Sequence, residues 1–188
     1  MTREDHTGCN FIDEPCRLGT GSKVERHWLI DPTRFQLPAA NYPAQSFQGI
    51  FYTLDFDNTV EESAYCQETI PWRWDTTTDI EVIVDWFHTG ADAGTVVWGI
   101  EYKSITAGEN FAPPTTTITQ TTAAGTAANV LLRTLFVSKI LAANLAAEDV
   151  IGIRFYRKAA DGSDTLAEDA RVVNVHFHFT MDKLGGAI

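Results

Sequence analysis

The sequence predicts an all-β protein, an antiparallel jelly-roll-like β-sandwich preceded by an extended N-terminal arm. Three observations favour this fold. From residue 46 onward, short runs rich in β-branched and aromatic residues recur between turn signals at fairly regular spacing. Apolar and polar residues alternate in several of these runs, which is the period of a half-buried strand. Helical periodicity is nearly absent, so we expect no layer of helices.

Residues 1–45 differ in composition from the rest of the 188-residue chain. Glycine and proline recur there, with only short apolar pieces between them, which predicts loops or an arm. Spaced aromatic side chains in such a segment indicate that it docks on another surface, such as a neighbouring subunit. We therefore expect an arm over 1–45 and a sandwich over 46–188. The candidate interface residues in the arm are Trp28, Leu29, Phe35 and Leu37.

Two alternating runs predict a hairpin in the sandwich. Apolar side chains share one parity in residues 80–86, and residues 96–102 repeat the pattern after the turn signal at 88–94. The threonine-rich run 115–122 predicts a strand on a solvated face or edge, because threonine is β-branched and uncharged. Residues 129–140 are apolar on both parities, which predicts a strand covered on both sides.

The last part of the chain predicts two strands that close the domain. Residues 149–159 and 171–179 alternate, and the Asp- and Gly-rich segment 160–169 between them predicts a long loop. Residues 141–149 are the one place where a short helical turn is expected. The total is seven or eight strands, mostly antiparallel.

The charge of the chain limits its partners. The formal net charge of −11, from 14 basic and 25 acidic residues, repels phosphate backbones and anionic lipid surfaces, so we expect neither nucleic acid nor membrane as a partner. No apolar run approaches the roughly 20 residues of a membrane-spanning helix, and the N-terminus has no apolar signal-peptide core. The three cysteines lack paired C-x-x-C spacing, which favours free thiols in a cytoplasm.

The run D-F-D-N-T-V at 55–60 resembles the first signature of the haloacid dehalogenase phosphatases. That resemblance implies Asp55 as the nucleophile and Asp57 as the acid that protonates the leaving group. Such a site needs a parallel sheet, but no alternation of strands with helices of about 10–15 residues follows. We interpret the run as a strand that ends in an Asx turn at Asp57 and Asn58, with the phosphatase as a remote alternative.

Two pairs of residues could bind a ligand. His176 and His178 share one face of a strand and could supply two metal ligands; no third ligand is visible, so we expect them to be solvated or at an interface. Trp72 and Trp74 share parity and could stack on a sugar ring, whereas tryptophans in a sandwich more often lie in the core or at a subunit interface. The chain has no G-x-S-x-G and no Gly-rich phosphate loop. We expect a non-enzymatic protein without catalytic residues, metal or cofactor.

Three motifs carry a resemblance to a known family: W-G-I-E-Y at 98–102, I-R-F-Y-R at 153–157 and D-T-L-A-E-D-A at 164–170. Their pattern of strands and turns resembles a β-sandwich domain of tailed-bacteriophage virion proteins, over about residues 45–180. The resemblance implies a role at the virion surface, such as head decoration or a tail- or fibre-associated component, commonly as a trimer. It implies no catalytic residues.

Two functional hypotheses follow, and both place the protein in a virion after synthesis in the cytoplasm of a bacterial host. The first is a capsid decoration or cement protein. It would be a homotrimer that binds the major capsid protein or another virion protein and stabilises the shell. The second is a tail- or fibre-associated module that binds a host-surface glycan, with Trp72 and Trp74 as its stacking residues.

Overall fold

The computed structural model describes residues 23–112 and 115–183, and these residues form ten strands and two short 3-10 helices. The first half contains β1 (Val24–Ile30), η1 (Pro32–Arg34), β2 (Ala44–Gln48), β3 (Phe51–Phe56), β4 (Glu62–Thr69) and β5 (Glu81–Phe87). The second half contains β6 (Thr95–Ile105), β7 (Thr116–Ala123), β8 (Leu132–Leu135), η2 (Ala142–Asn144), β9 (Val150–Arg157) and β10 (Ala170–Met181).

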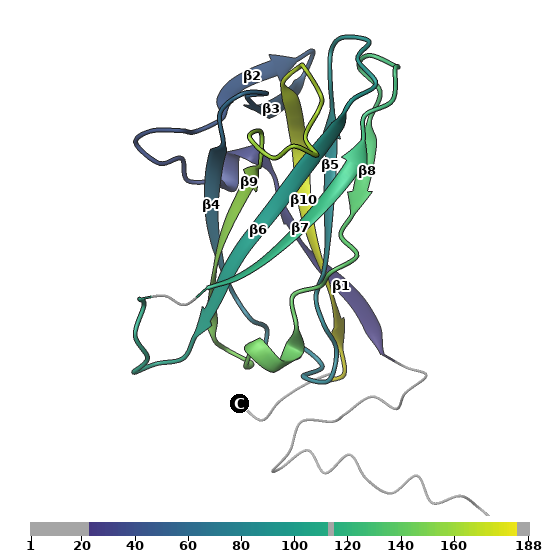
Figure 1. Ribbon diagram of the computed structural model, residues 1–188. Helices are drawn as coiled ribbons and strands as arrows, with labels where there is room; N and C mark the ends of the chain where they lie inside the picture. The colour runs from purple at the N-terminus through teal and green to yellow at the C-terminus, as the bar shows by residue number, and fades with distance from the viewer. Residues whose placement is uncertain (1–22, 113–114, 184–188) are drawn as a thin grey trace, which may run out of the picture.

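The strands form two antiparallel sheets that pack face to face (Figure 1). One sheet has the order β2-β3-β10-β5-β8, with β1 also paired to β10, and the other has the order β4-β9-β6-β7. From β3 onward, the chain moves between the sheets so that β3-β10-β5-β8 faces β4-β9-β6-β7, which is the strand order of a jelly roll. The predicted fold class is confirmed.

The predicted hairpin between residues 80–86 and 96–102 is wrong. β5 pairs with β10 and β8, whereas β6 pairs with β9 and β7 in the other sheet. The segment between β5 and β6 therefore carries the chain across the sandwich. Alternation along a strand indicates which side chains face the core, but it does not indicate which strand lies alongside.

The predicted arm boundary at residue 45 also differs from the structure. All of β1 pairs with β10, from Val24 opposite Met181 to Ile30 opposite Val175. Ile30 and Phe35 are buried in the core. Residues 24–45 thus belong to the sandwich, while the first 22 residues of the expected arm lie outside the described residues. The burial pattern of β1, with only Ile30 buried, explains why its sequence does not resemble a core strand.

Two strand predictions concern the open side of the sandwich. The threonine-rich run forms β7, which is an edge strand of the four-stranded sheet, as expected. The strand expected to be covered on both sides is instead β8, the outer strand of its own sheet, and Leu135 within it is 53% exposed. The expected helical turn is η2. With β1 and β2 included, the described residues contain ten strands, which is more than the seven or eight predicted.

The core between the sheets contains an aromatic cluster. The ring of Trp98 stacks on Phe155 with centroids 5.1 Å apart, and Phe56 meets both rings edge-on. Trp86 meets Trp98 edge-on and donates its Nε1 hydrogen to the Thr134 hydroxyl at 2.9 Å. Aromatic pairs of this geometry contribute about 0.5–1.5 kcal/mol beyond their buried area. The cluster joins β3, β5, β6, β8 and β9, and therefore holds the two sheets together.

Candidate functional site

The outer face of the four-stranded sheet carries a hollow of about 740 Å³ over β4, β9 and β6, which we call the outer groove. Ligand sites commonly have volumes of about 300–1,000 Å³. The floor consists of two neighbouring cross-strand rows of side chains on the same face of the sheet. The rows are Tyr65, Arg154 and Glu101, and then Gln67, Gly152 and Lys103.

Gly152 deepens the groove at the centre of the floor. It lies on β9 between Gln67 of β4 and Lys103 of β6. A Cβ atom on Gly152 would meet only the Lys103 carbonyl oxygen, at 4.0 Å. The space above Gly152 is therefore open, and a larger side chain there would enter the groove without disturbing the backbone. A glycine inside a strand pattern is the sequence signal that could have indicated this site.

The guanidinium of Arg154 is fixed in position by four groups. Its Nε donates to the Ser63 hydroxyl at 2.8 Å, and its terminal nitrogens donate to Glu61 at 2.6 Å and to Glu101 at 3.2 Å. Its Cζ atom lies 4.2 Å from the ring centroid of Tyr156, a cation–π contact. The central charge of the groove is thus held rigidly and is already neutralised.

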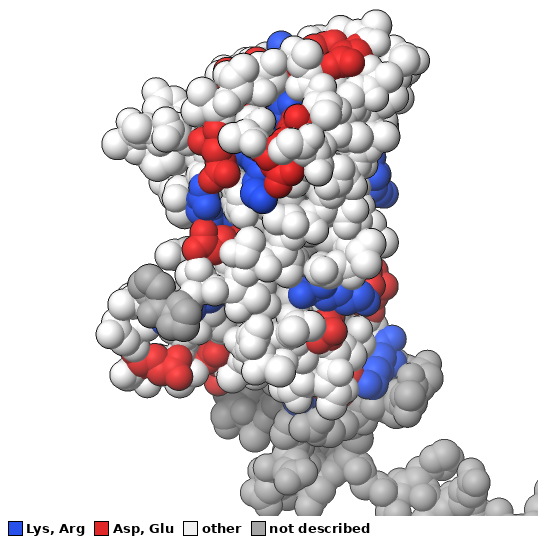
Figure 2. Space-filling view, viewed as in Figure 1, with Lys and Arg blue, Asp and Glu red and all other residues white. Residues whose placement is uncertain are grey.

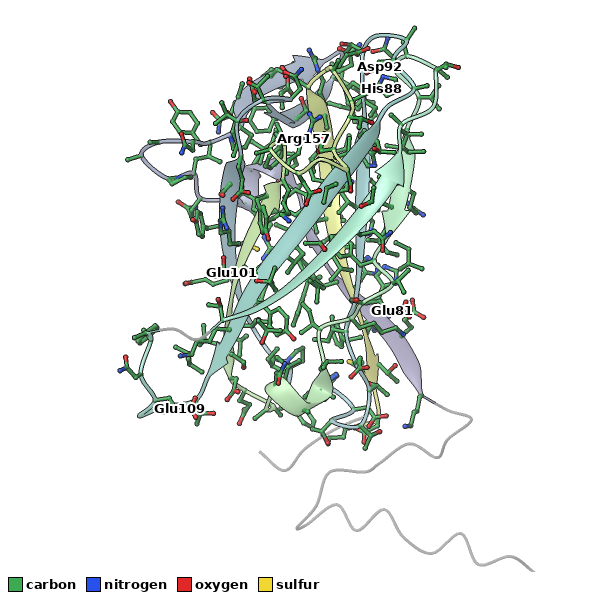
Figure 3. The ribbon with its side chains drawn as sticks, in the orientation of Figure 1. Glu81, His88, Asp92, Glu101, Glu109 and Arg157 are labelled. Atoms are coloured by element: carbon green, nitrogen blue, oxygen red, sulfur yellow. The ribbon has the colours of Figure 1, made fainter. Side chains whose placement is uncertain are left out.

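Glu101 is an ionised acceptor in the groove. The Thr115 hydroxyl donates to one of its carboxylate oxygens at 2.5 Å, and Arg154 donates to the other. These hydrogen bonds, with that from Thr115 contributing most, hold the pKa of Glu101 below its ordinary value. Figure 3 shows Glu101 on β6, above the loop that carries Glu109.

Two walls border the groove. On one side, the backbone of Gln36 pairs with that of Tyr65 through hydrogen bonds of 2.7 and 2.9 Å, which extends the sheet beyond β4. On the other side lies the loop that carries Phe111, whose side chain is 83% exposed. Lys103 anchors this loop by donating to the carbonyl oxygens of Asn110, at 2.9 Å, and Ala112.

The formal charges of the groove cancel. Arg34 pairs with Glu68, as Arg154 pairs with its two glutamates. The three basic and three acidic side chains in or beside the groove are Arg34, Lys103, Arg154, Glu61, Glu68 and Glu101. Figure 2 shows basic and acidic side chains interspersed on this side of the molecule, without a broad field of one sign.

A second surface lies at the opposite end of the molecule from the residue 106–112 loop, at the top of Figure 1. Large apolar side chains are exposed there on the β2–β3 hairpin and on the loop before β8, and we call this surface the hairpin end. Its residues, with exposed fractions, are Phe47 (69%), Ile50 (91%), Phe51 (59%), Val130 (48%) and Leu131 (58%). Phe51 and Leu131 line one pocket of about 300 Å³ together with Phe87.

A third surface, which we call the lateral edge, follows the open side of the sandwich beside β7 and β8. Three aliphatic side chains are exposed there: Leu135 (53%), Val137 (83%) and Leu141 (48%). β7 and β8 are the outer strands of their sheets, so this side also presents strand edges without a partner in the described chain.

The structure brings a third histidine to the predicted pair. His27 of β1 lies opposite His178, and its ring centroid is 5.4 Å from that of His178 and 5.9 Å from that of His176. The His176 Nε2 lies 2.8 Å from an Asp85 carboxylate oxygen, and the His178 Nδ1 lies 2.9 Å from Glu25. In the part of the chain that the structure describes, no group of three ligand side chains is arranged to hold a metal ion.

The six predicted interface residues have different environments. Phe35 and Trp74 are buried in the core, at 5% and 0% exposure. These two therefore offer no surface to a partner, and Trp74 offers no ring face to a sugar. Trp28 and Leu37 are half-buried and pack against the core. Trp72 is also half-buried. Leu29 is 41% exposed.

The D-F-D-N-T-V run has a structural role. The Asp57 carboxylate accepts hydrogen bonds from the backbone nitrogens of Thr59 at 2.5 Å and Val60 at 2.8 Å, which is the predicted Asx turn. Asp55 accepts from the hydroxyls of Ser46 and Thr53, both at 2.7 Å. Neither the parallel sheet nor the following helix of the phosphatase signature is found among the described residues. No helix in the described ranges is long and apolar enough to cross a membrane.

The sheet topology and the groove define this chain as a jelly-roll β-sandwich protein with a hollowed outer face. No family model and no curated protein sequence matches the chain. Similar solved structures include a chain of infectious bursal disease virus, Gx strain, at 15% identity and a TM-score of 0.35, covering 84% of this chain and 32% of that chain. PorU from Porphyromonas gingivalis has 6% identity and a TM-score of 0.35, covering 94% of this chain and 14% of that chain.

A third similar structure is the family 11 carbohydrate-binding module from Clostridium thermocellum, in complex with a β-1,3-1,4-mixed-linked tetrasaccharide. It has 8% identity and a TM-score of 0.40, and the match covers 93% of this chain and 98% of that chain. The chain thus spans less than two thirds of the viral chain and of PorU. At these TM-scores, the fold assignment rests on the strand pairings of the chain itself.

Proposed function

We propose that this chain is a structural protein of a tailed-bacteriophage virion, of the decoration type, that attaches to a protein shell through its hairpin end. The observation that carries the proposal is the group of exposed large apolar side chains there, because clustered exposed apolar side chains mark an interaction site. Phe47 lies on one face of the β2–β3 hairpin, and Phe51 lies on the other face beside Leu131. Ile50 at the tip of the hairpin is 91% exposed and would bury most on contact. The partner is the major capsid protein or another virion protein.

The second part of the proposal concerns self-association. In a homotrimer, the lateral edges would meet neighbouring copies and cover the outer strands β7 and β8. The hairpin ends would then lie together and contact several shell subunits at once, so that attachment gains from multivalency. The net charge of −11 keeps the remaining surface hydrated.

The test is re-binding of the purified chain to phage particles stripped of accessory proteins, measured by co-sedimentation. The double variant Phe47→Ser with Ile50→Ser should lose attachment, because it removes the two most exposed apolar side chains of the hairpin end. Phe111→Ser is the matched control, since Phe111 is equally apolar and 83% exposed but lies away from the hairpin end. Attachment of the double variant at the same occupancy as the unmodified chain would refute the proposal.

A further inference from the structure

We propose that the outer groove is a binding site for a neutral oligosaccharide. This activity is separate from shell attachment, because the groove lies on the outer face of the four-stranded sheet, whereas the β2–β3 hairpin belongs to the other sheet. Neither the sequence motifs nor the tryptophan pair at 72 and 74 indicates it, because the groove is assembled from β4, β6, β9 and two loops.

The side chains of the groove match the two chemical characters of a sugar ring. Each ring has an apolar C–H face, and the exposed rings of Tyr65 and Phe111 provide apolar faces on which it can pack. Each ring also carries neighbouring hydroxyls that donate and accept. The carboxylate of Glu101 accepts, while side-chain amides both donate and accept.

Two amides in the groove have unused hydrogen-bonding capacity. The side chains of Gln36 and Gln67 line the groove, and neither makes a side-chain hydrogen bond with another of the described residues. They lie on either side of Tyr65: Gln67 on the same strand face, and Gln36 on the neighbouring wall. A planar amide beside an aromatic ring can contact the edge of a sugar while the ring supports its face.

The charge balance favours a neutral ligand over an anionic one. Arg34 and Arg154 are each paired with glutamate, and Lys103 is committed to the carbonyl oxygens of the loop. An anionic polysaccharide or a phosphate would have to displace these partners, and Glu101 would repel it. The rigid Arg154 instead orients Glu101 as an acceptor.

The floor of the groove also argues against an extended peptide as the ligand. Peptides that add to a sheet need a free strand edge with unpaired backbone groups. β9 and β6, which form the centre of the floor, are paired on both sides, so their backbone groups are already used. The ligand must therefore be recognised by side chains on the face of the sheet, which suits a polyhydroxylated chain.

The experiment is isothermal titration calorimetry of the full chain with five neutral probes: cellohexaose, maltohexaose, laminarihexaose, mannohexaose and chitohexaose. Heparin is the anionic probe. We expect at least one neutral probe to bind, and we expect Tyr65→Ala and Gln67→Ala each to weaken it at least tenfold. Gly152→Leu should abolish binding by filling the floor, with no decrease in thermal unfolding midpoint, because its Cβ meets no atom closer than 4.0 Å.

Tyr42→Ala is the matched control, since Tyr42 is 47% exposed, compared with 41% for Tyr65, and lies outside the groove. It should bind as the unmodified chain does. Three results would each overturn the proposal: no heat with any neutral probe at about 1 mM, preferential binding of heparin, or equal affinity of the Gly152→Leu and unmodified chains. The Phe47→Ser/Ile50→Ser variant should bind the sugar normally, which separates this site from shell attachment.

Discussion

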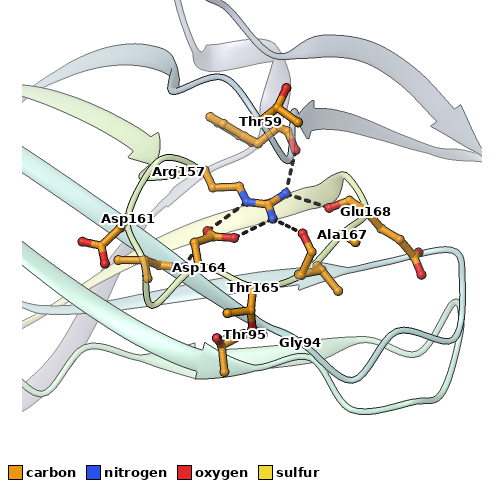
Figure 4. Close-up of polar contacts among 12 residues, drawn as sticks. Thr59, Gly94, Thr95, Arg157, Asp161, Asp164, Thr165, Ala167 and Glu168 are labelled. Carbon is orange, nitrogen blue, oxygen red and sulfur yellow. Dashed lines mark hydrogen bonds and ion pairs between the residues drawn. The ribbon is translucent and has the colours of Figure 1, made fainter.

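Arg157 is fully buried at the end of β9, and its guanidinium makes five hydrogen bonds (Figure 4). Two of them, at 3.0 and 2.8 Å, go to the carboxylate of Asp164, whose side chain is 1% exposed. The other three go to the carbonyl oxygens of Phe56, Leu166 and Glu168. This one side chain therefore fastens the loop between β9 and β10 to the end of β3.

We expect Arg157→Met to lower the free energy of unfolding by roughly 3–5 kcal/mol, because it leaves the buried Asp164 carboxylate without its cation. Adding Asp164→Leu should restore part of the loss, since the unpaired charge is then removed. Urea denaturation of the single and double variants measures both effects. Lys158→Met, at a surface ion pair, is the control and should change stability far less. A double variant no more stable than Arg157→Met would contradict this account.

The lowered pKa of Asp85 makes the free energy of unfolding depend on pH. Burial alone would raise its pKa, but hydrogen bonds from Arg133 (2.7 and 2.9 Å) and His176 (2.8 Å) outweigh burial and lower the pKa below the ordinary 3.8. Because the folded pKa is the lower one, the stabilisation is fully present above the unfolded pKa and is lost as pH falls through the folded pKa.

We therefore expect Asp85→Asn to be less stable than the unmodified chain at neutral pH, and the difference to shrink below about pH 4. Urea denaturation at several pH values between about 2 and 7 measures this difference. A stability difference that stays constant over this range would show that the Asp85 charge does not contribute to folding.

At the scale of the element, β1 is a strand that the sequence pattern did not predict. It has one buried residue, Ile30, and is held by its pairing with β10. Local alternation is weak in such a strand, because one neighbour and a few core contacts are enough to keep it in place. The same pairing brings His27 to His176 and His178, which explains why the third histidine was not anticipated.

Removal of residues 1–45 should destabilise the sandwich. The truncation deletes β1 and the buried side chains of Ile30 and Phe35, each worth about 1.5–3 kcal/mol of burial, from a fold whose total stability is expected at about 5–15 kcal/mol. Removal of residues 1–22, which leaves β1 in place, is the matched comparison and should lower the thermal midpoint less than removal of residues 1–45. Circular dichroism during heating measures both, and equal midpoints for the two truncations would show that β1 is dispensable.

For the whole molecule, the lateral edge makes a prediction about oligomeric state. Light scattering on the full chain should give three times the mass of the 20.8 kDa chain. Val137→Lys should reduce it to the monomer, because a charge would be buried at the contact. Val150→Lys, at a 40% exposed valine on β9, should leave the trimer intact. A chain that is monomeric at every concentration would remove the trimer from the proposed function.

The candidate site was less predictable than the fold. The D-F-D-N-T-V run was correctly interpreted as a strand and an Asx turn, because both depend on a few adjacent residues. Tyr65, Gly152 and Glu101 are far apart in the sequence and meet through strand pairing. Trp74 was a candidate for a sugar site, but it is fully buried, since a tryptophan pattern does not distinguish a core ring from a surface ring.

The sequence alone was enough to establish the class of fold, a solvated face or edge for the threonine-rich β7, and the buried faces of β5, β6 and β9, because these follow from local periodicity and turn chemistry. In β10, a register shift between Val172 and Asn174 buries Val172 in place of Val173, which alternation alone does not predict. Strand partners, the place of β1, the exposure of the hairpin end and the outer groove required the tertiary structure. The physical reason is that alternation along a strand determines which of its faces is buried, but it does not determine which strands pair with it. The pairing of distant strands then selects which side chains share a surface.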